Sequence, residues 1–194
     1  MIVTGNEGGP ISNAEATAWI NNFKNANPNE TWSHLFGINV INSVIAQSGC
    51  VALRFYNALD AQNVKKIIIF GVNVNGDGLN GYIADNAIPC PPNANCTMAV
   101  TGNEGGPIQG NTALTWINNF KTANPNGIWS HMFGINVMNN VKTQAGCVGF
   151  RVHNAIDPKG ARKIIVYGVN AAGVGLTNYI AEFSSTCPPV CGRP

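Results

Sequence analysis

The nonapeptide VTGNEGGPI occupies residues 3–11 and recurs without change at residues 100–108. The two halves of the chain align without a gap over 92 positions, and 54 of these positions are identical. A period of 97 residues is longer than the roughly 20–50 residues of solenoid repeats and matches the size of a small domain. The sequence therefore predicts two homologous repeat domains, residues 1–97 and residues 98–194.

Each repeat begins with a helical pattern. The nonapeptide itself favours a Gly-Pro turn leading into a helix, with a backbone anion cradle as the alternative. Ser12 and Glu15 then have the spacing of a capping box, and apolar residues follow at helical intervals until Pro28. A second helix is predicted over residues 32–48, and its counterpart over residues 129–145.

The pattern then changes to strands. Residues 51–56 alternate between apolar and other side chains, residues 66–74 form a nearly continuous apolar run, and residues 82–87 indicate a weaker third strand. The fold class is therefore α+β, with two helices and a small antiparallel sheet (ααβββ) in each repeat. Because so small a sheet leaves its edges exposed, we expect the two repeats to cover one another as an intramolecular pseudo-dimer.

The apolar faces of these elements define the expected core. Its members in the first repeat are Trp19, Ile20, Phe23, Phe36, Val40, Val51, Leu53, Phe55 and Ile68, each with a counterpart 97 residues later.

Low charge is the main feature of the composition. Charged residues make up 10% of the chain, against about 25% in ordinary globular proteins, and 29 asparagines supply much of the polarity. The net charge is +2, divided as −2 in the first repeat and +4 in the second. Such a surface has little electrostatic repulsion between copies, which favours self-association.

Several classes of partner and location are disfavoured. Nucleic-acid binding requires a cluster of Lys and Arg, and the sequence has none. No apolar run approaches the roughly 20 residues of a membrane span. The repeat begins at once, without a segment resembling a signal peptide, so we expect a cytoplasmic protein, or an extracellular one if a leader is removed or the protein belongs to an exported assembly.

The six cysteines fall three in each repeat. We expect short loop disulfides, Cys90–Cys96 and Cys187–Cys191, and one buried free thiol per repeat. In a reducing cytosol the paired cysteines would remain thiols.

Zinc binding is the alternative, because Cys187 and Cys191 have the spacing of zinc ligands. The other ligands do not converge, however: a continuous helix would place His34 roughly 24 Å from Cys50. We therefore expect no metal and no other cofactor.

Several motifs together carry a resemblance. The segments GCVALRFYNALD and GCVGFRVHNAID, the turn GVNVNGDG, and the ends CPPNANC and CPPVC resemble a set of small uncharacterised bacterial proteins with a GCVGxRxY strand and a terminal CPPxC. The resemblance covers nearly all of each repeat and implies the domain boundary, but no activity. This chain departs from the set in being doubled and in having His153 where the first repeat has Tyr56.

Arg54 and Arg151 lie in the middle of otherwise apolar strands. The simpler interpretation places each on the solvent face of its sheet, paired with Asp60 or Asp157. The alternative places each arginine at an interface between repeats or subunits, where the planar guanidinium favours bidentate contacts.

The sequence contains little that indicates catalysis. Three histidines are present, and no hydrolase or metalloprotease motif accompanies them. We expect a non-catalytic structural or interaction protein, which associates with itself, as an oligomer or filament, or with another assembly protein. The first alternative is a small-molecule or glycan-binding module that uses Trp32 and Trp129 as a sugar platform, and the second is an enzyme of unknown type.

Overall fold

The computed structural model describes residues 2–91, 96, 98–189 and 191. Within these residues the chain has a mixed α+β fold with four helices and two antiparallel sheets of six strands each. The helices are α1 (Asn13–Ala26), α2 (Ile38–Ile45), α3 (Gly110–Ala123) and α4 (Ile135–Lys142). The strands are β1 (Gly9–Pro10), β2 (Ser33–Gly37), β3 (Ala52–Leu59), β4 (Lys65–Val72), β5 (Gly78–Asp85), β6 (Ile88–Cys90), β7 (Gly106–Pro107), β8 (Ser130–Gly134), β9 (Gly149–Ile156), β10 (Arg162–Val169), β11 (Gly175–Glu182) and β12 (Ser185–Cys187).

Each sheet takes strands from both halves of the chain. One, the β9 sheet, has the order β1-β11-β10-β9-β2-β6, and the other, the β3 sheet, has the order β12-β8-β3-β4-β5-β7. Strand β2 pairs with β9, with Phe36 opposite Phe150, and β8 pairs with β3, with Phe133 opposite Leu53. The sequence predicts that each half builds its own sheet. Instead, the β9–β10 hairpin of the second half pairs with β2 of the first, and the β3–β4 hairpin of the first half pairs with β8 of the second.

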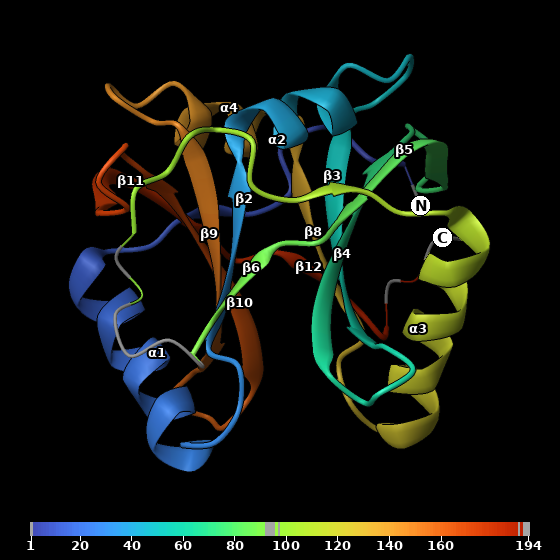
Figure 1. Cartoon of the computed structure of the whole chain (residues 1–194), viewed down its shortest axis with the longest axis horizontal. Coiled ribbons are helices and arrows are strands. Elements are labelled where there is room, and N and C mark those ends of the chain that lie inside the picture. Colours follow the sequence, from blue (N-terminus) through green and yellow to red (C-terminus); the bar gives the residue numbers. More distant parts are fainter. Residues whose placement is uncertain (1, 92–95, 97, 190, 192–194) are drawn as a thin grey trace.

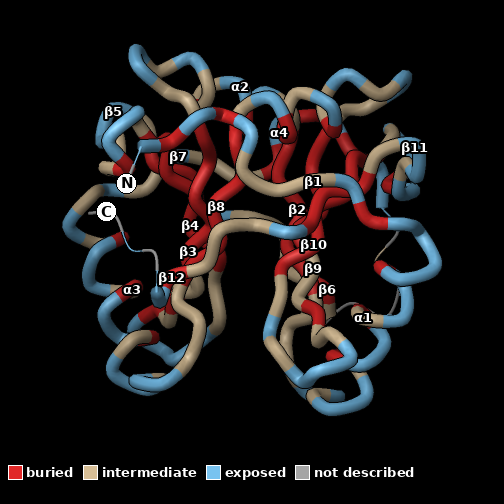
Figure 2. Tube along the Cα trace, turned by 180° about the vertical axis from the view of Figure 1, so that it is seen from behind, coloured by how far each residue is buried: buried red, intermediate tan, exposed pale blue. Residues whose placement is uncertain are grey.

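The elements form four layers (Figure 1). The two sheets face each other across an inner core, α1 covers the outer face of the β9 sheet, and α3 covers that of the β3 sheet. Helices α2 and α4 lie side by side at one end of the inner core. Figure 2 shows the buried backbone concentrated in the strands, whereas the outer helices are exposed along one side.

The first helix begins and ends as predicted. The Ser12 hydroxyl accepts a hydrogen bond from the Glu15 amide at 3.2 Å, so the N-cap half of the predicted capping box is confirmed. The Glu15 carboxylate accepts from the Ser12 hydroxyl at 2.7 Å, rather than from the Ser12 amide as in a complete capping box. The helix ends at Ala26, immediately before the Asn-Pro step.

The second helix is shorter than predicted, and the extent 32–48 is wrong. Residues 33–37 form β2, and the helix covers only residues 38–45; the corresponding residues of the second half behave in the same way. These residues become strands because partners from the other half supply the backbone hydrogen bonds, which no local pattern reveals.

Strand β3 was expected to have one solvent face, and this is also wrong. Leu53 and Phe55 on its inner face are buried in the inner core, and the outer face is buried as well. There α3 packs over Tyr56, while Arg54 contacts Gly76 and Met132. Most of the expected core is buried. The exceptions are half-buried: Trp19, Val51, Trp116 and Val148.

The repeated nonapeptide lies at the contact between the two halves. The carbonyl oxygens of Gly5 and Glu7 accept hydrogen bonds from the amides of Asn136 and Gly134, at the junction of β8 and α4. The Glu7 carboxylate accepts bonds from the Thr4 and Gly5 amides at 2.6 and 3.1 Å. Two of the segment's amides are thus bonded to its own glutamate, and Glu104 accepts from Thr101 and Gly102 in the same way in the second half.

Candidate functional site

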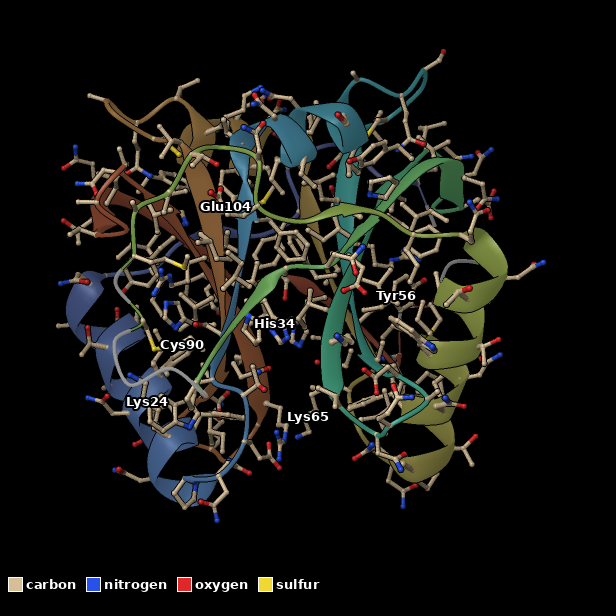
Figure 3. The ribbon with its side chains drawn as sticks, in the orientation of Figure 1. Lys24, His34, Tyr56, Lys65, Cys90 and Glu104 are labelled. Carbon is tan, nitrogen blue, oxygen red and sulfur yellow. A yellow bond between two sulfur atoms is a disulfide. The ribbon has the colours of Figure 1, made fainter. Side chains whose placement is uncertain are left out.

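A pocket of about 400 Å³ lies between α1 and the outer face of the β9 sheet. Its wall combines helix residues of the first half with strand and turn residues of the second half. The side chains that give it its chemical character are Thr17, Asn21, Lys24, Arg151, His153 and Tyr167. Figure 3 marks Lys24 on the outer helix that forms one wall.

Arg151 lies at the base of this pocket and is only 8% exposed. Its Nη1 donates to the carbonyl oxygen of Cys96, and its Nε has no hydrogen-bond partner among the described residues. The expected pairing with Asp157 is wrong: that carboxylate accepts the amides of Lys159 and Ala161 instead. Burial lowers the pKa of the Arg151 guanidinium, which nevertheless remains a cation.

His153 stands beside the arginine with its ring edge-on to Tyr167, at 5.5 Å between centroids. Burial, together with the positive charges of Arg151 and Lys24, lowers the pKa of His153 to about 3. The Nδ1 atom of this neutral imidazole is buried and has no partner within the described part of the chain. The Tyr167 hydroxyl reaches Asn13 Oδ1 at 3.1 Å.

The equivalent position in the other sheet is closed. Arg54 is 1% exposed and donates to the Tyr56 hydroxyl at 3.4 Å and to the Gly76 carbonyl at 3.2 Å. The Tyr56 ring packs edge-on against Phe70, and both are buried; Figure 3 marks Tyr56 beside α3. The expected pairing of Arg54 with Asp60 is wrong, and the arginine instead contacts Met132 of the second half at 3.3 Å.

His34 and His131 lie deep between the sheets. Because a carbonyl can only accept, His34 Nε2 donates to the Lys65 carbonyl at 3.3 Å, and His131 Nδ1 is 2.8 Å from the Ser184 hydroxyl. Burial lowers the pKa of His34 to about 4 and that of His131 to about 3, so both are neutral at physiological pH.

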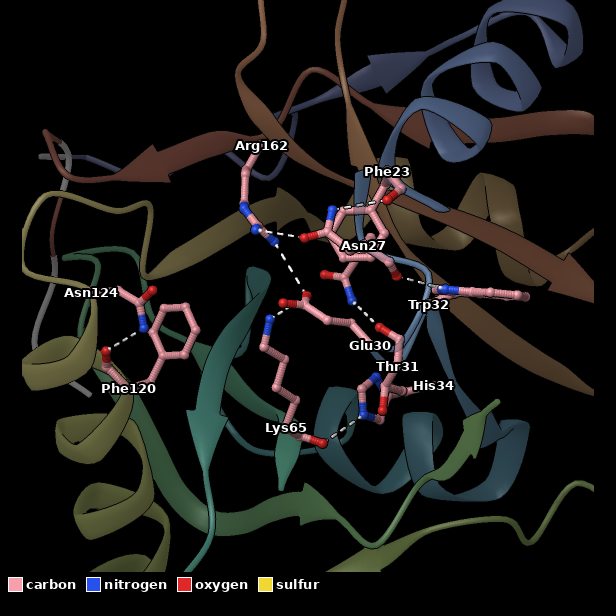
Figure 4. A network of polar contacts seen from close by, with 11 residues as sticks. Phe23, Asn27, Glu30, Thr31, Trp32, His34, Lys65, Phe120, Asn124 and Arg162 are labelled. Atoms are coloured by element: carbon pink, nitrogen blue, oxygen red, sulfur yellow. Dashed lines mark hydrogen bonds and ion pairs between the residues drawn. The ribbon is translucent and has the colours of Figure 1, made fainter. Parts of the chain in front are cut away.

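The cavity beside these histidines, about 20 Å³, has room for roughly one water molecule. Its cations are already paired. Glu30 contacts Lys65 and lies 3.9 Å from Arg162, as Figure 4 shows, while Lys66 is 3.6 Å from Asp60. The charged groups of this cavity are therefore paired with one another, while the buried His34 Nδ1 in its wall has no hydrogen-bond partner among the described residues.

Trp32 and Trp129, the expected sugar platform, are half-buried. The Trp32 indole donates to the Asn27 carbonyl at 3.1 Å, and Lys24 Nζ lies 5.1 Å from its ring centroid. Lys121 covers Trp129 in the same way at 5.4 Å. One face of each ring is thus occupied by a lysine of the preceding helix.

The cysteine pairs lie at disulfide distance. The Cα atoms of Cys90 and Cys96 are 5.5 Å apart, and those of Cys187 and Cys191 are 4.8 Å apart. The remaining cysteines, Cys50 and Cys147, are half-buried free thiols, and burial raises the pKa of each.

Neither a metal site nor a membrane-spanning helix is present among the residues that the structure describes. Among the described residues no group of three or more His, Cys, Asp or Glu side chains is placed to hold a metal ion. The helices in the described ranges are too short or too polar to cross a bilayer.

The pocket was not predicted from the sequence, although one signal pointed to it. Arg151 was a candidate, and the change from Tyr56 to His153 between repeats was noted. Two further differences line the same place: Thr17 corresponds to Leu114, and Tyr167 to Phe70. Positions where the repeats differ in polarity therefore mark the pocket.

Comparison of the chain with protein-family models, curated proteins and solved structures found no match.

Proposed function

We propose that the chain is a non-catalytic interaction protein whose two homologous repeats form an intramolecular pseudo-dimer. The observation that carries this proposal is the exchange of β2 and β8. Residues 33–37 pair with residues 149–153, and residues 130–134 pair with residues 52–56. A repeat on its own would leave these backbone groups unpaired, at a cost that the other repeat removes.

Separate production of residues 1–97 and residues 98–194 tests the pseudo-dimer. Each half is expected to fold only by pairing, with itself or with the other half, and the mixture should contain a 1:1 complex with the circular dichroism of the intact chain. A half that unfolds cooperatively as a monomer would contradict the proposal.

The non-catalytic part of the proposal is supported by the state of the reactive groups. Burial lowers the pKa of all three imidazoles far below neutrality, which makes them weak bases, and it raises the pKa of the two free thiols, which disfavours the nucleophilic thiolate.

We also propose that the chain associates with itself or with another assembly protein. Low charge supports it, but the sheet edges do not, since β1, β6, β7 and β12 are only two or three residues long and offer little backbone for pairing. Light scattering after size exclusion provides the test: a mass well above 20.5 kDa supports self-association, and a strict monomer contradicts it.

The second candidate is a small-molecule or glycan-binding module. It is favoured by the pocket at Arg151 rather than by the tryptophans, because the pocket has open volume whereas one face of each indole is covered by a lysine.

A further inference from the structure

We propose that the pocket between α1 and the β9 sheet binds a small hydroxylated ligand that carries one anionic group, of the class of acidic sugars. This inference deepens the second candidate function and rests on it, since it names the ligand class of the same pocket. It does not depend on the pseudo-dimer, because it uses only residues that line one pocket of the intact chain.

The charge of the pocket favours an anion. The side chains lining it include the cations Lys24 and Arg151, and no Asp or Glu occurs among its described lining residues. Arg151 lines the pocket, and its planar guanidinium suits a carboxylate or phosphate group. Burial, and after it the positive charges of Arg151 and Lys24, lower the pKa of the neighbouring His153.

The rest of the lining suits a hydroxylated carbon skeleton. Thr17 and Asn21 of α1 and Thr177 of β11 offer donors and acceptors, and the Tyr167 ring and Ile20 offer an apolar surface. A volume of about 400 Å³ falls within the range of small-molecule sites, roughly 300–1,000 Å³.

The difference between the two halves provides an independent argument. At the equivalent place in the β3 sheet, Tyr56 and Phe70 fill the space beneath α3 and Arg54 is fully enclosed. Replacement of the buried Tyr56 and Phe70 by His153 and Tyr167 exchanges buried apolar surface for polar groups, and Thr17 stands where the closed side has the exposed Leu114. Burying polar groups without partners costs free energy, so packing alone does not favour that exchange. A polar ligand that bonds to these groups would favour it.

Titration calorimetry on the intact chain tests the proposal. The probes are glucuronate, galacturonate, N-acetylneuraminate and glucose 6-phosphate, with glucose as the neutral reference, at concentrations up to about 10 mM. At least one acidic probe should bind saturably and at least tenfold more tightly than glucose. If only the sugar carboxylates bind, or only the sugar phosphate, the result identifies the anionic group. If both classes bind, the pocket recognises a hydroxylated anion of either kind.

The repeat provides matched variants. Arg151→Gln should weaken binding at least tenfold, while Arg54→Gln at the closed position should leave it unchanged. Lys24→Gln should weaken binding severalfold, with Lys121→Gln as its control. The triple variant Thr17→Leu, His153→Tyr, Tyr167→Phe installs the side chains found at the closed position, so it should keep its melting temperature and lose binding even if Arg151→Gln does not fold.

A spectroscopic readout locates the ligand. An anion beside Arg151 offsets the positive field, so NMR titration should show the pKa of His153 rising on saturation, while that of His34 stays unchanged. The proposal is overturned if no acidic probe binds, if glucose binds equally well, or if the triple variant retains binding.

Discussion

Gly134, at the end of β8, lies so close to the backbone of Gly5 that a Cβ atom on Gly134 would be 2.1 Å from the Gly5 carbonyl carbon. The same contact occurs with the halves exchanged: a Cβ atom on Gly37 would be 2.2 Å from the carbonyl carbon of Gly102. The identical nonapeptides are therefore packed against the strand-to-helix junction of the opposite half, where side chains have no space.

Gly134→Ala should destabilise the protein strongly, by about 3 kcal/mol, because backbone atoms cannot move aside as a flexible side chain can. Denaturant unfolding measures the change. Gly106→Ala is the control, since a Cβ atom there would meet nothing within 4 Å. Equal stability of the two variants would show that the halves do not approach closely at this point.

Phe133→Ala should cost about 3–5 kcal/mol, because Phe133 is fully buried in the inner core and packs edge-on against Phe55 at 5.7 Å. Phe183→Ala is the matched control, with 56% of that residue exposed, and should change the free energy of unfolding by less than about 1 kcal/mol. A similar loss in both variants would contradict the position of the inner core.

Asp85 and Glu182 should make stability fall as pH rises. Both are fully buried, and their carboxylate oxygens have no hydrogen-bond partner among the described residues. Burial raises the pKa of each, although Lys66 and Lys163 partly offset this effect. A carboxyl whose pKa is raised in the folded state contributes stability in full below its pKa in the unfolded chain, about 4. That contribution is lost as the pH rises through its pKa in the folded state.

Asp85→Asn should therefore flatten the decline in the free energy of unfolding above about pH 4. The unchanged chain, measured over the same range of pH, is the reference. Identical profiles for the variant and the unchanged chain would mean that the Asp85 carboxylate is solvated or paired.

Reduction should leave the fold intact. The loops closed by Cys90–Cys96 and Cys187–Cys191 are short, so each disulfide contributes about 2 kcal/mol in the chain-entropy account. Thiol titration of the unfolded chain should detect the two free cysteines without reductant and all six with it. Six thiols without reductant would contradict the pairing, and loss of the folded circular dichroism on reduction would contradict a purely local role.

Features with local causes could be predicted from the sequence. Ser12 with Glu15 fixes the start of α1, and the Asn-Pro step after Ala26 ends it. The strand at residues 66–74 was also predicted, since its apolar run is continuous and β4 occupies most of it.

Features that depend on the other half could not be predicted. Ser33 pairs with His153, far away in sequence, and this pairing makes β2 a strand. Arg54 alternates with apolar neighbours, which indicates a solvent face, but it is buried and contacts Met132 of the other half. The pocket could not be predicted for the same reason. Lys24 and Arg151 belong to different halves and line one pocket only because the two halves share their sheets.

The covalent joining of the two halves has a consequence for symmetry. In a homodimer of identical chains, any substitution at the position of Tyr56 would appear in both subunits, and opening one pocket would weaken both cores. Because Tyr56 and His153 are encoded separately, one site can keep its aromatic packing while the other exchanges packing for polarity. The stoichiometry that follows is one ligand per chain.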